Sequence, residues 1–176
     1  LTAVKNREEA MVRHIEDSLS LLSVFDLQDQ KVVDVGTGGG LPGIPLKIAR
    51  PNIHITLVDA TRKKTEFLKH AVDSLSLKDV DVLWGRGEEL CRKAQYHKKF
   101  DIAISRAVGK LDGLLSCTLP FVKNGGFVIA YKQDDIADEV KTASVTLKKL
   151  KGEITDIKKV KVGDIVRSLV FIKAGE

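Results

Sequence analysis

The sequence contains little cysteine, and the cysteines it has are not arranged to bind a metal. Only two of the 176 residues are cysteine, Cys91 and Cys117, and neither a CxxC spacing nor a histidine cluster accompanies them. The pattern therefore predicts no zinc site and no disulfide framework, and isolated thiols are typical of a reducing compartment. We expect a cytoplasmic protein with two structural cysteines and no bound metal.

Long apolar runs are also missing. No stretch reaches the roughly 18 apolar residues of a membrane-spanning helix, and no signal-peptide pattern is present. The sequence thus gives no indication that the chain spans or crosses a membrane, and it contains no internal repeat or low-complexity linker. The first residue is Leu1 rather than methionine, which favours a piece of a longer chain.

The composition suits one folded domain with a moderate positive charge. A chain of 176 residues with 43% hydrophobic residues can form a real core, so residues 1–176 are expected to be a single domain. Lys and Arg number 29 against 24 Asp and Glu, and the net charge of +5 is compatible with a polyanionic partner. The oligomeric state is left open, with a monomer favoured.

A strand that runs into a glycine-rich turn organises the chain. Residues 31–43 read KVVDVGTGGGLPG, in which valines flank Asp34 before the glycines begin. This pattern predicts a buried strand and a tight turn whose backbone can approach a nucleotide-like ligand closely. The turn is the predicted cofactor site.

Two classes of cofactor protein use such a turn. Gly38, Gly40 and Gly43 match the dinucleotide spacing G-x-G-x-x-G, with Asp59 about 20 positions further on. The run that begins at Asp34 also matches acid-x-G-x-G-x-G, the first motif of class I methyltransferases that use S-adenosylmethionine. We favour the second class because a pyrophosphate would be repelled by the Asp34 carboxylate. A buried acid in an apolar strand also needs a partner.

Residues 4–25 carry apolar side chains at spacings of three and four, which predicts one amphipathic helix packed on a core. Within it, His14 and Asp17 lie one turn apart and can hydrogen-bond to each other. The pair is either a surface pair of little consequence or a pair that faces the cofactor cleft. The spacing alone favours neither interpretation.

Polar residues end two of the predicted strands. The runs at 54–59 and 100–106 end in Asp59 and Arg106, at the carboxyl edge where ligands of open α/β sheets bind. Asp59 is expected to accept hydrogen bonds from ribose hydroxyls, or to cap the following helix. The run at 80–84 ends in Trp84, which is predicted to be core.

Strands alternate with helices up to residue 150, and two successive strands follow at 153–162 and 167–174. This order predicts an α/β fold, a Rossmann-like three-layer αβα sandwich with a mainly parallel seven-stranded sheet and an antiparallel last strand. Dehydrogenase halves do not usually finish this way, which again favours a methyltransferase. In the predicted helix at 62–75, Phe67 and Leu75 are expected to face inward.

Five segments carry a specific resemblance: LTAVKNREEAMVRHIEDSL, VDVGTGGGLPGIPLKIARP, TLVDATRKKTEFLK, ISRAVGKL and RSLVFIKA. Over nearly the whole chain they resemble the bacterial ribosomal RNA small-subunit methyltransferases that modify guanine N7, also called glucose-inhibited division protein B. RHIxDS and LPGIPL are the most diagnostic motifs. The resemblance implies S-adenosylmethionine as cofactor, a guanine of 16S ribosomal RNA as acceptor, RNA or the 30S particle as partner, and a helical segment before Leu1.

The resemblance also implies roles for single residues. A set at the turn and the strand ends would contact the cofactor: Gly36, Gly38, Leu41, Asp59, Gly87, Glu88 and Arg106. His14 and Asp17 belong to RHIxDS, which favours the interpretation in which they face the cleft and act with Arg106 as positioning residues. The chain departs from the family at Tyr131-Lys132-Gln133, where Leu-Lys-Gly is usual.

The acceptor defines the chemistry that the resemblance implies. Guanine N7 has a lone pair and no proton, so we expect no general base and a mechanism that depends on positioning. Candidate RNA phosphate contacts are Arg13, Arg62, Lys63, Lys64 and Lys132. The alternatives are a methyltransferase for another substrate and a non-catalytic RNA-binding module.

Overall fold

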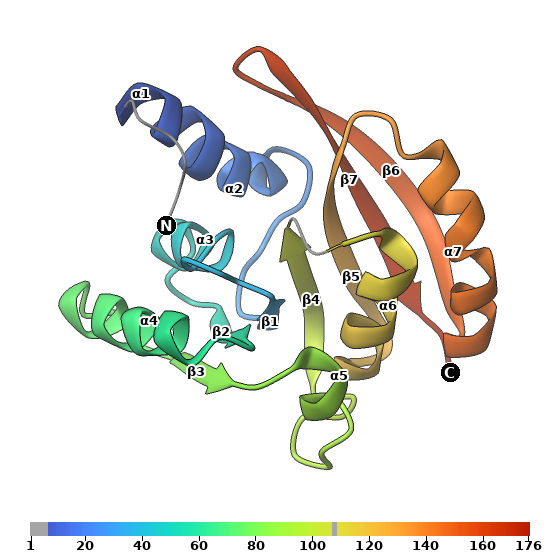
Figure 1. Cartoon of the computed structure of the whole chain (residues 1–176), viewed down its shortest axis with the longest axis horizontal. Coiled ribbons are helices and arrows are strands. Elements are labelled where there is room, and N and C mark those ends of the chain that lie inside the picture. The colour runs from blue at the N-terminus through green and yellow to red at the C-terminus, as the bar shows by residue number, and fades with distance from the viewer. Residues whose placement is uncertain (1–6, 107–108) are drawn as a thin grey trace.

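The computed structural model of the protein describes residues 7–106 and 109–176, and its centre is a seven-stranded sheet (Figure 1). The strands are β1 (Lys31–Val35), β2 (His54–Asp59), β3 (Val80–Trp84), β4 (Phe100–Arg106), β5 (Val122–Gln133), β6 (Gly152–Val162) and β7 (Ile165–Ala174). Their order is β3-β2-β1-β4-β5-β7-β6. The first five are parallel neighbours, and β7 is antiparallel to both β5 and β6. The predicted fold class, including the antiparallel last strand, is confirmed.

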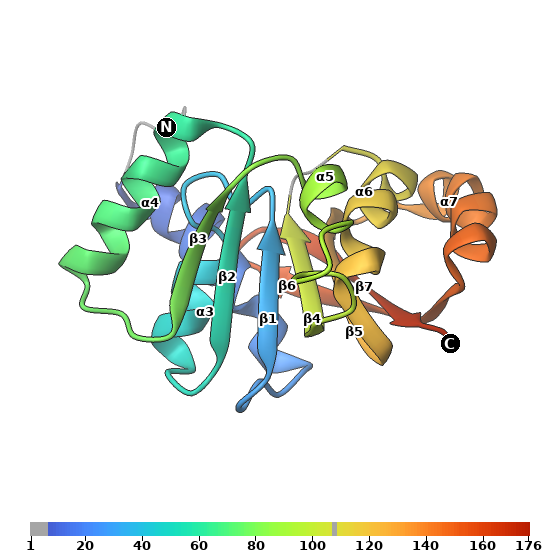
Figure 2. The same cartoon turned by 90° about the horizontal axis from the view of Figure 1, so that it is seen from below.

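Helices cover both faces of this sheet (Figure 2). The helices are α1 (Arg7–Ala10), α2 (Asp17–Leu19), α3 (Gly43–Ala49), α4 (Arg62–Ser74), α5 (Gly87–Leu90), α6 (Leu111–Thr118) and α7 (Ala137–Leu150). One core joins the sheet to α5, α6 and α7, and the other joins it to α3, α4 and the N-terminal helical segment. The result is the predicted three-layer sandwich.

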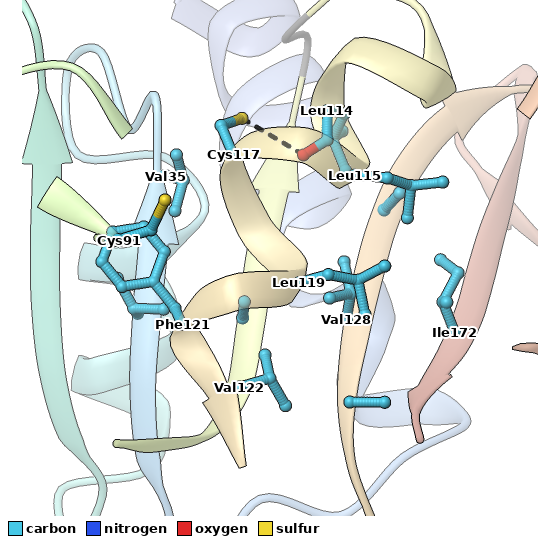
Figure 3. Packing of buried hydrophobic residues seen from close by; sticks show 14 of the residues in the cluster. Val35, Cys91, Leu114, Leu115, Cys117, Leu119, Phe121, Val122, Val128 and Ile172 are labelled. Carbon is cyan, nitrogen blue, oxygen red and sulfur yellow. Dashed lines mark hydrogen bonds between the residues drawn. The ribbon is translucent and has the colours of Figure 1, made fainter. Parts of the chain in front are cut away.

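Alternation along β1 explains how one strand serves both cores. Val33 and Val35 pack in the α5–α7 core, whereas Val32 packs in the α3–α4 core. Cys91 and Cys117 belong to the first of these cores and carry free thiols (Figure 3). Burial raises the pKa of the Cys117 thiol to about 12, so it is unreactive, as expected for a structural cysteine.

The N-terminal helical segment differs from the single helix predicted at 4–25. Residues 4–6 lie outside the described residues. From Arg7 onward the segment runs through α1, a π-helical turn (Met11–Glu16), α2 and a 3₁₀ turn (Ser20–Ser23). The hydroxyl of Ser18 donates to the carbonyl of His14, and that of Ser20 donates to the carbonyl of Asp17 at 2.7 Å. Such side-chain bonds compete with the regular helical ladder, which periodicity cannot reveal.

Three large apolar side chains are more exposed than predicted. Phe67 is 54% exposed, Leu75 is 51% exposed and Trp84 is 60% exposed. In α4 the buried residues are instead Thr65, Leu68 and Val72, which form a single stripe at helical spacing. Since β3 is the edge strand of the sheet, Trp84 has no further strand to cover it. The prediction that these three face the core was therefore wrong.

Candidate functional site

The glycine turn after β1 is held open at the carboxyl edge of the sheet. The amides of Gly36 and Thr37 both donate to the carbonyl of Val58, at 2.9 and 3.1 Å, which joins the turn to β2. Gly36 has φ +74° and Gly38 has φ +60°, values that favour glycine. A Cβ atom at Gly38 or Gly39 would meet no other atom within 4 Å. One side of the turn is thus bare backbone that a ligand can approach.

Asp34 fixes the other side of the turn to α3. One carboxylate oxygen, Oδ2, accepts from the hydroxyl of Thr37 at 2.7 Å and from the amide of Gly43 at 2.9 Å. A Cβ at Gly43 would lie 2.8 Å from this oxygen, so the contact requires glycine. The second oxygen, Oδ1, is buried and has no hydrogen-bond partner among the described residues. The buried acid does have a partner, as the sequence required, but the partner is the turn itself.

Replacing Asp34 by asparagine is expected to stabilise the protein more at pH 8 than at pH 5. Burial raises the pKa of Asp34 to about 7 from its usual 3.8, although the bonds from Thr37 and Gly43 oppose the rise. Between pH 3.8 and about pH 7 the folded chain therefore keeps a proton on Asp34 that the unfolded chain has released. The free energy of unfolding consequently falls as the pH rises through this range. Asparagine keeps an acceptor for both donors and never ionises.

The measurement is urea unfolding of Asp34→Asn and the unmodified protein at both pH values. The difference in unfolding free energy should grow by on the order of 2 kcal/mol between pH 5 and pH 8. A difference that is the same at the two pH values would contradict the raised pKa.

Asp59 joins the end of β2 to the glycine turn. Its Oδ2 accepts from the amide of Gly38 at 2.9 Å, and its Oδ1 accepts from the amide of Thr61 at 2.8 Å. Lys64 approaches the same carboxylate at 3.9 Å. Each carboxylate oxygen keeps a lone pair that can accept from a ribose hydroxyl. The ribose role of Asp59 is therefore possible and stays a prediction. The N-cap of α4 is Thr61, and Asp59 accepts from the amide of that residue rather than from an amide inside the helix, so Asp59 is not itself the N-cap.

Gly87 and Glu88 form the start of α5, beside the end of β1. Gly87 is buried, and a Cβ there would lie 2.8 Å from Val35 and 3.1 Å from Cys117. Glu88 is exposed. The hydroxyl of Ser105, near the end of β4, donates to the carbonyl of Val35 at 2.8 Å. The structure thus places the predicted residues that follow β1, β2 and β3 at the same edge of the sheet. Leu41 lies beyond the turn and is half-buried.

A second group of predicted residues forms an ion-pair cluster at the end of β4. The carboxylate of Asp17 is buried, and its two oxygens bind two arginines, Arg106 Nη1 at 3.2 Å and Arg167 Nε at 3.2 Å. Arg106 also donates to the carbonyls of Arg13 and His14, at 3.2 and 3.4 Å. Arg106 therefore fastens the π-helical turn to the sheet. The sequence prediction missed Arg167, which is 150 residues from Asp17 and follows no motif.

His14 bonds to Arg106 and not to Asp17. The Nδ1 atom of His14 lies 3.2 Å from Arg106 Nη2, and no bond joins His14 to Asp17 among the described residues. Desolvation and the neighbouring guanidinium of Arg106 lower the pKa of His14, so the ring is neutral at physiological pH. A neutral ring that accepts at Nδ1 carries its proton at Nε2, a buried atom with no partner among the described residues.

These residues border a pocket of about 510 Å³ at the carboxyl edge. Its lining consists of Arg13, His14, Asp17, Arg106, Gly109, Tyr131, Lys132, Gln133, Glu139 and Arg167. His14 and Asp17 both line this pocket, but no residue of the glycine turn does, so the interpretation in which they face the cofactor cleft stays a prediction. Within the described residues, no cluster of His, Cys, Asp or Glu could hold a metal ion.

Comparison with known proteins decides the family. The model of the family described as GidB, rRNA small subunit methyltransferase G, matches residues 1–170. The chain belongs to this family. A protein of that name from Thermoanaerobacter sp. is 40% identical over 98% of this chain and 73% of its own length. One from Caldanaerobacter subterraneus subsp. tengcongensis is 42% identical over the same shares.

Solved structures show the fold more widely. M. jannaschii TYW2, solved in complex with AdoMet, has a TM-score of 0.73 at 14% identity and covers 98% of this chain and 79% of its own. A predicted O-methyltransferase from Agrobacterium tumefaciens has a TM-score of 0.69 at 18% identity, over 93% and 81% of the two chains. At such identities the likeness concerns the fold alone, which rRNA small subunit methyltransferase G proteins share with this wider group.

Among the candidate RNA phosphate contacts predicted from the sequence, Lys132 departs from the prediction. Lys132 is only 9% exposed. Its ammonium binds Glu139 at 2.6 Å and the carbonyl of Gly109 at 2.8 Å, so it is not an open phosphate contact. The other candidates are exposed: Arg13, Arg62, Lys63 and Lys64. Arg13 pairs with Glu9 at 2.9 Å, and Arg62 pairs with Glu66 at 3.1 Å.

Tyr131 adds a bond between β5 and the N-terminal helical segment. Its buried hydroxyl donates to the carbonyl of Ser18 at 2.9 Å.

We expect Tyr131→Phe to lower the free energy of unfolding by about 0.5–1.5 kcal/mol, because the Ser18 carbonyl loses a donor. Urea unfolding measures the change. Tyr96→Phe is the control, since the Tyr96 hydroxyl has no bond among the described residues. Equal effects of the two substitutions would contradict the role of the bond.

Proposed function

We propose that the protein transfers a methyl group from S-adenosylmethionine to N7 of a specific guanine in small-subunit ribosomal RNA. Family membership over residues 1–170 is the observation that carries this proposal. The site geometry supports it, because the open glycine turn and the polar pocket both lie at the carboxyl edge of the parallel strands. The helices of the described residues include none that is long and apolar enough to cross a membrane.

The residues at the turn fit the cofactor. Bare backbone at Gly38 and Gly39 can admit its amino-acid portion, and the spare lone pairs of Asp59 can accept ribose hydroxyls. Gly36, Leu41, Gly87, Glu88 and Arg106 complete the proposed contacts. When bound, S-adenosylmethionine supplies an electrophilic methyl group on a sulfonium.

The protein's own residues would position the acceptor. Guanine N7 carries an unprotonated lone pair, so no side chain needs to remove a proton, and none is assigned as a base. Alignment of two bound reactants can contribute roughly 7–11 kcal/mol to catalysis. Asp17, through Arg106 and Arg167, holds the helical segment and β7 around the pocket. His14 presents an Nε2 donor that needs an acceptor. We therefore assign positioning roles to His14, Asp17 and Arg106.

Binding of ribosomal RNA is expected to weaken steeply with salt, because phosphate contacts release counterions. Each contact to a single strand contributes about −0.7 to the slope of log K against log salt. Lys63→Gln should therefore make the slope shallower by about 0.7. Lys149→Gln, in the last turn of α7 and away from the carboxyl edge, should leave the slope unchanged. Filter binding over a salt series measures both, and a flat response of the unmodified protein would contradict the phosphate contacts.

Methyl transfer to different acceptors tests the proposal. Labelled S-adenosylmethionine is offered with unmodified small-subunit ribosomal RNA, with assembled 30S particles, and without RNA. Label in RNA or in particles is the expected result, and the comparison identifies the form of the substrate. Label transferred without RNA would favour a methyltransferase for another substrate. RNA binding with no transfer in either form would favour a non-catalytic module.

A further inference from the structure

A pocket of about 480 Å³ lies between the glycine turn and the first turns of α4, apart from the pocket around Arg106. Phe67 and the exposed Lys63 and Lys64 line it from α4, and Gly38, Gly39 and Leu41, which include proposed cofactor contacts, line it from the glycine turn. The Phe67 ring is exposed. A Cβ at Gly39 would meet nothing within 4 Å, so this part of the wall is flat, accessible backbone. The pocket thus offers one aromatic ring and one open backbone surface to a planar group.

The rim of this pocket is cationic. Lys63 has neither an ion pair nor a hydrogen bond among the described residues, and Lys64 only approaches Asp59 at 3.9 Å. The first turn of α4 contains no acidic residue, and Glu66 pairs with Arg62 rather than with either lysine. An occupant with a planar apolar group and a negative charge would complement this arrangement.

We propose that the pocket binds a nucleobase of single-stranded RNA, stacked on Phe67, with the neighbouring phosphate at Lys63. This rests on the proposed function, because the strand is the substrate RNA beside its target guanine. An aromatic platform with a basic rim is the usual way in which proteins hold single strands without reading their sequence. The pocket borders the cofactor turn, so a strand that reaches the turn can also reach Phe67.

Two other occupants fit the same pocket less well. Lysine is depleted at protein–protein interfaces, whereas here two lysines form the rim. A protein partner would be expected to bind the neighbouring apolar groove, which Ile48, Phe67 and Leu75 line, rather than the two lysines. S-adenosylmethionine is proposed to contact the turn side of this pocket through Gly38, Gly39 and Leu41, but its net positive charge does not complement Lys63 and Lys64 on the α4 side. The negative charge of a phosphodiester complements Lys63 and Lys64, so RNA is the favoured occupant.

The test measures binding of a short single-stranded oligoribonucleotide that contains 5-iodouracil, without and with S-adenosylhomocysteine. We expect Phe67→Ala to weaken binding roughly 5- to 100-fold and Phe67→Trp to preserve it. Leu75→Ala is the matched control, because Leu75, the C-cap of α4, is similarly exposed but lies outside this pocket. It should bind RNA like the unmodified protein. Ultraviolet light should crosslink the RNA to the tryptic peptide that contains Phe67.

Three results would overturn this proposal. They are unchanged RNA binding by Phe67→Ala, equal weakening by Phe67→Ala and Leu75→Ala, and loss of the crosslink on addition of S-adenosylhomocysteine. The second would indicate an apolar protein-docking surface, and the third would assign the pocket to the cofactor. Because the binding test needs no turnover, Phe67-dependent binding without methyl transfer would contradict only the proposed function.

Discussion

Replacing Asp17 by alanine is expected to lower the free energy of unfolding by about 3–5 kcal/mol, the usual effect of breaking a buried ion pair from one side. The carboxylate is 2% exposed and is bound by Arg106 and Arg167 through separate oxygens. Without it, two largely covered guanidinium groups would face each other with no counter-charge. The N-terminal helical segment would also lose its main polar attachment to β4 and β7.

Urea unfolding of Asp17→Ala and Asp17→Asn measures this effect. Asparagine keeps one acceptor oxygen and the shape of the side chain, so its loss should be smaller. Glu9→Ala is the control, because it removes only the exposed pair with Arg13 and should change stability by less than about 1 kcal/mol. A loss for Asp17→Ala as small as that of the control would contradict the cluster's role in stability.

Replacing Arg106 by alanine is expected to reduce kcat/KM for methyl transfer by at least about 100-fold, the size of loss that a misplacement of about 1 Å can cause. Arg106 binds the Asp17 carboxylate, the His14 ring and two carbonyls of the π-helical turn. These bonds determine the shape of the pocket in which the acceptor would lie. Arg106→Lys should recover little activity, because an ammonium cannot reproduce the planar fork.

Steady-state kinetics with RNA, together with calorimetry of cofactor binding, measures this prediction. Arg92→Ala, at an exposed position outside both pockets, should behave like the unmodified protein. The double variant with Asp17→Ala should lose less activity than the sum of the two single losses, because the two residues bind each other within one cluster. Full activity of Arg106→Lys would contradict the requirement for the guanidinium.

The parts of the site that could be predicted from the sequence are those made by neighbours in the chain. The turn at Gly36 and Gly38 depends on local glycine conformation and on the end of β1, so its spacing was informative. Asp59 was placed correctly because parallel strands bring their carboxyl ends to one edge. The need of the buried Asp34 carboxylate for donors was predicted correctly, but Thr37 and Gly43 of the turn itself supply them, so this carboxylate gives no support for a bound ligand.

The ion-pair cluster could not be predicted in this way. Arg167 reaches Asp17 only because β7 inserts between β5 and β6, and no local pattern carries that register. The expected bond between His14 and Asp17 is absent for the same reason, since Arg106, 89 residues from Asp17, binds both. Lys132 is covered because Glu139 on α7 lies against it. Each outcome depends on contacts between distant elements.

The arrangement of the site links the fold to the proposed chemistry. Backbone around the glycine turn is held by Asp34 and Asp59, while the pocket proposed for the acceptor is bordered by an ion-pair cluster that spans β4, β7 and the N-terminal helical segment. The proposed cofactor and acceptor sites are thus held mostly by different residues, and Arg106 is proposed for both. This division suits a reaction that needs alignment and no proton transfer.

Mapping the transferred methyl group tests the central claim most directly. Unmodified small-subunit RNA or particles are incubated with the protein and labelled S-adenosylmethionine, and the RNA is then cleaved chemically at 7-methylguanine. The account predicts one cleavage site, at one guanine, that coincides with the label. Label at another atom or another base, or no label although the cofactor binds, would contradict it.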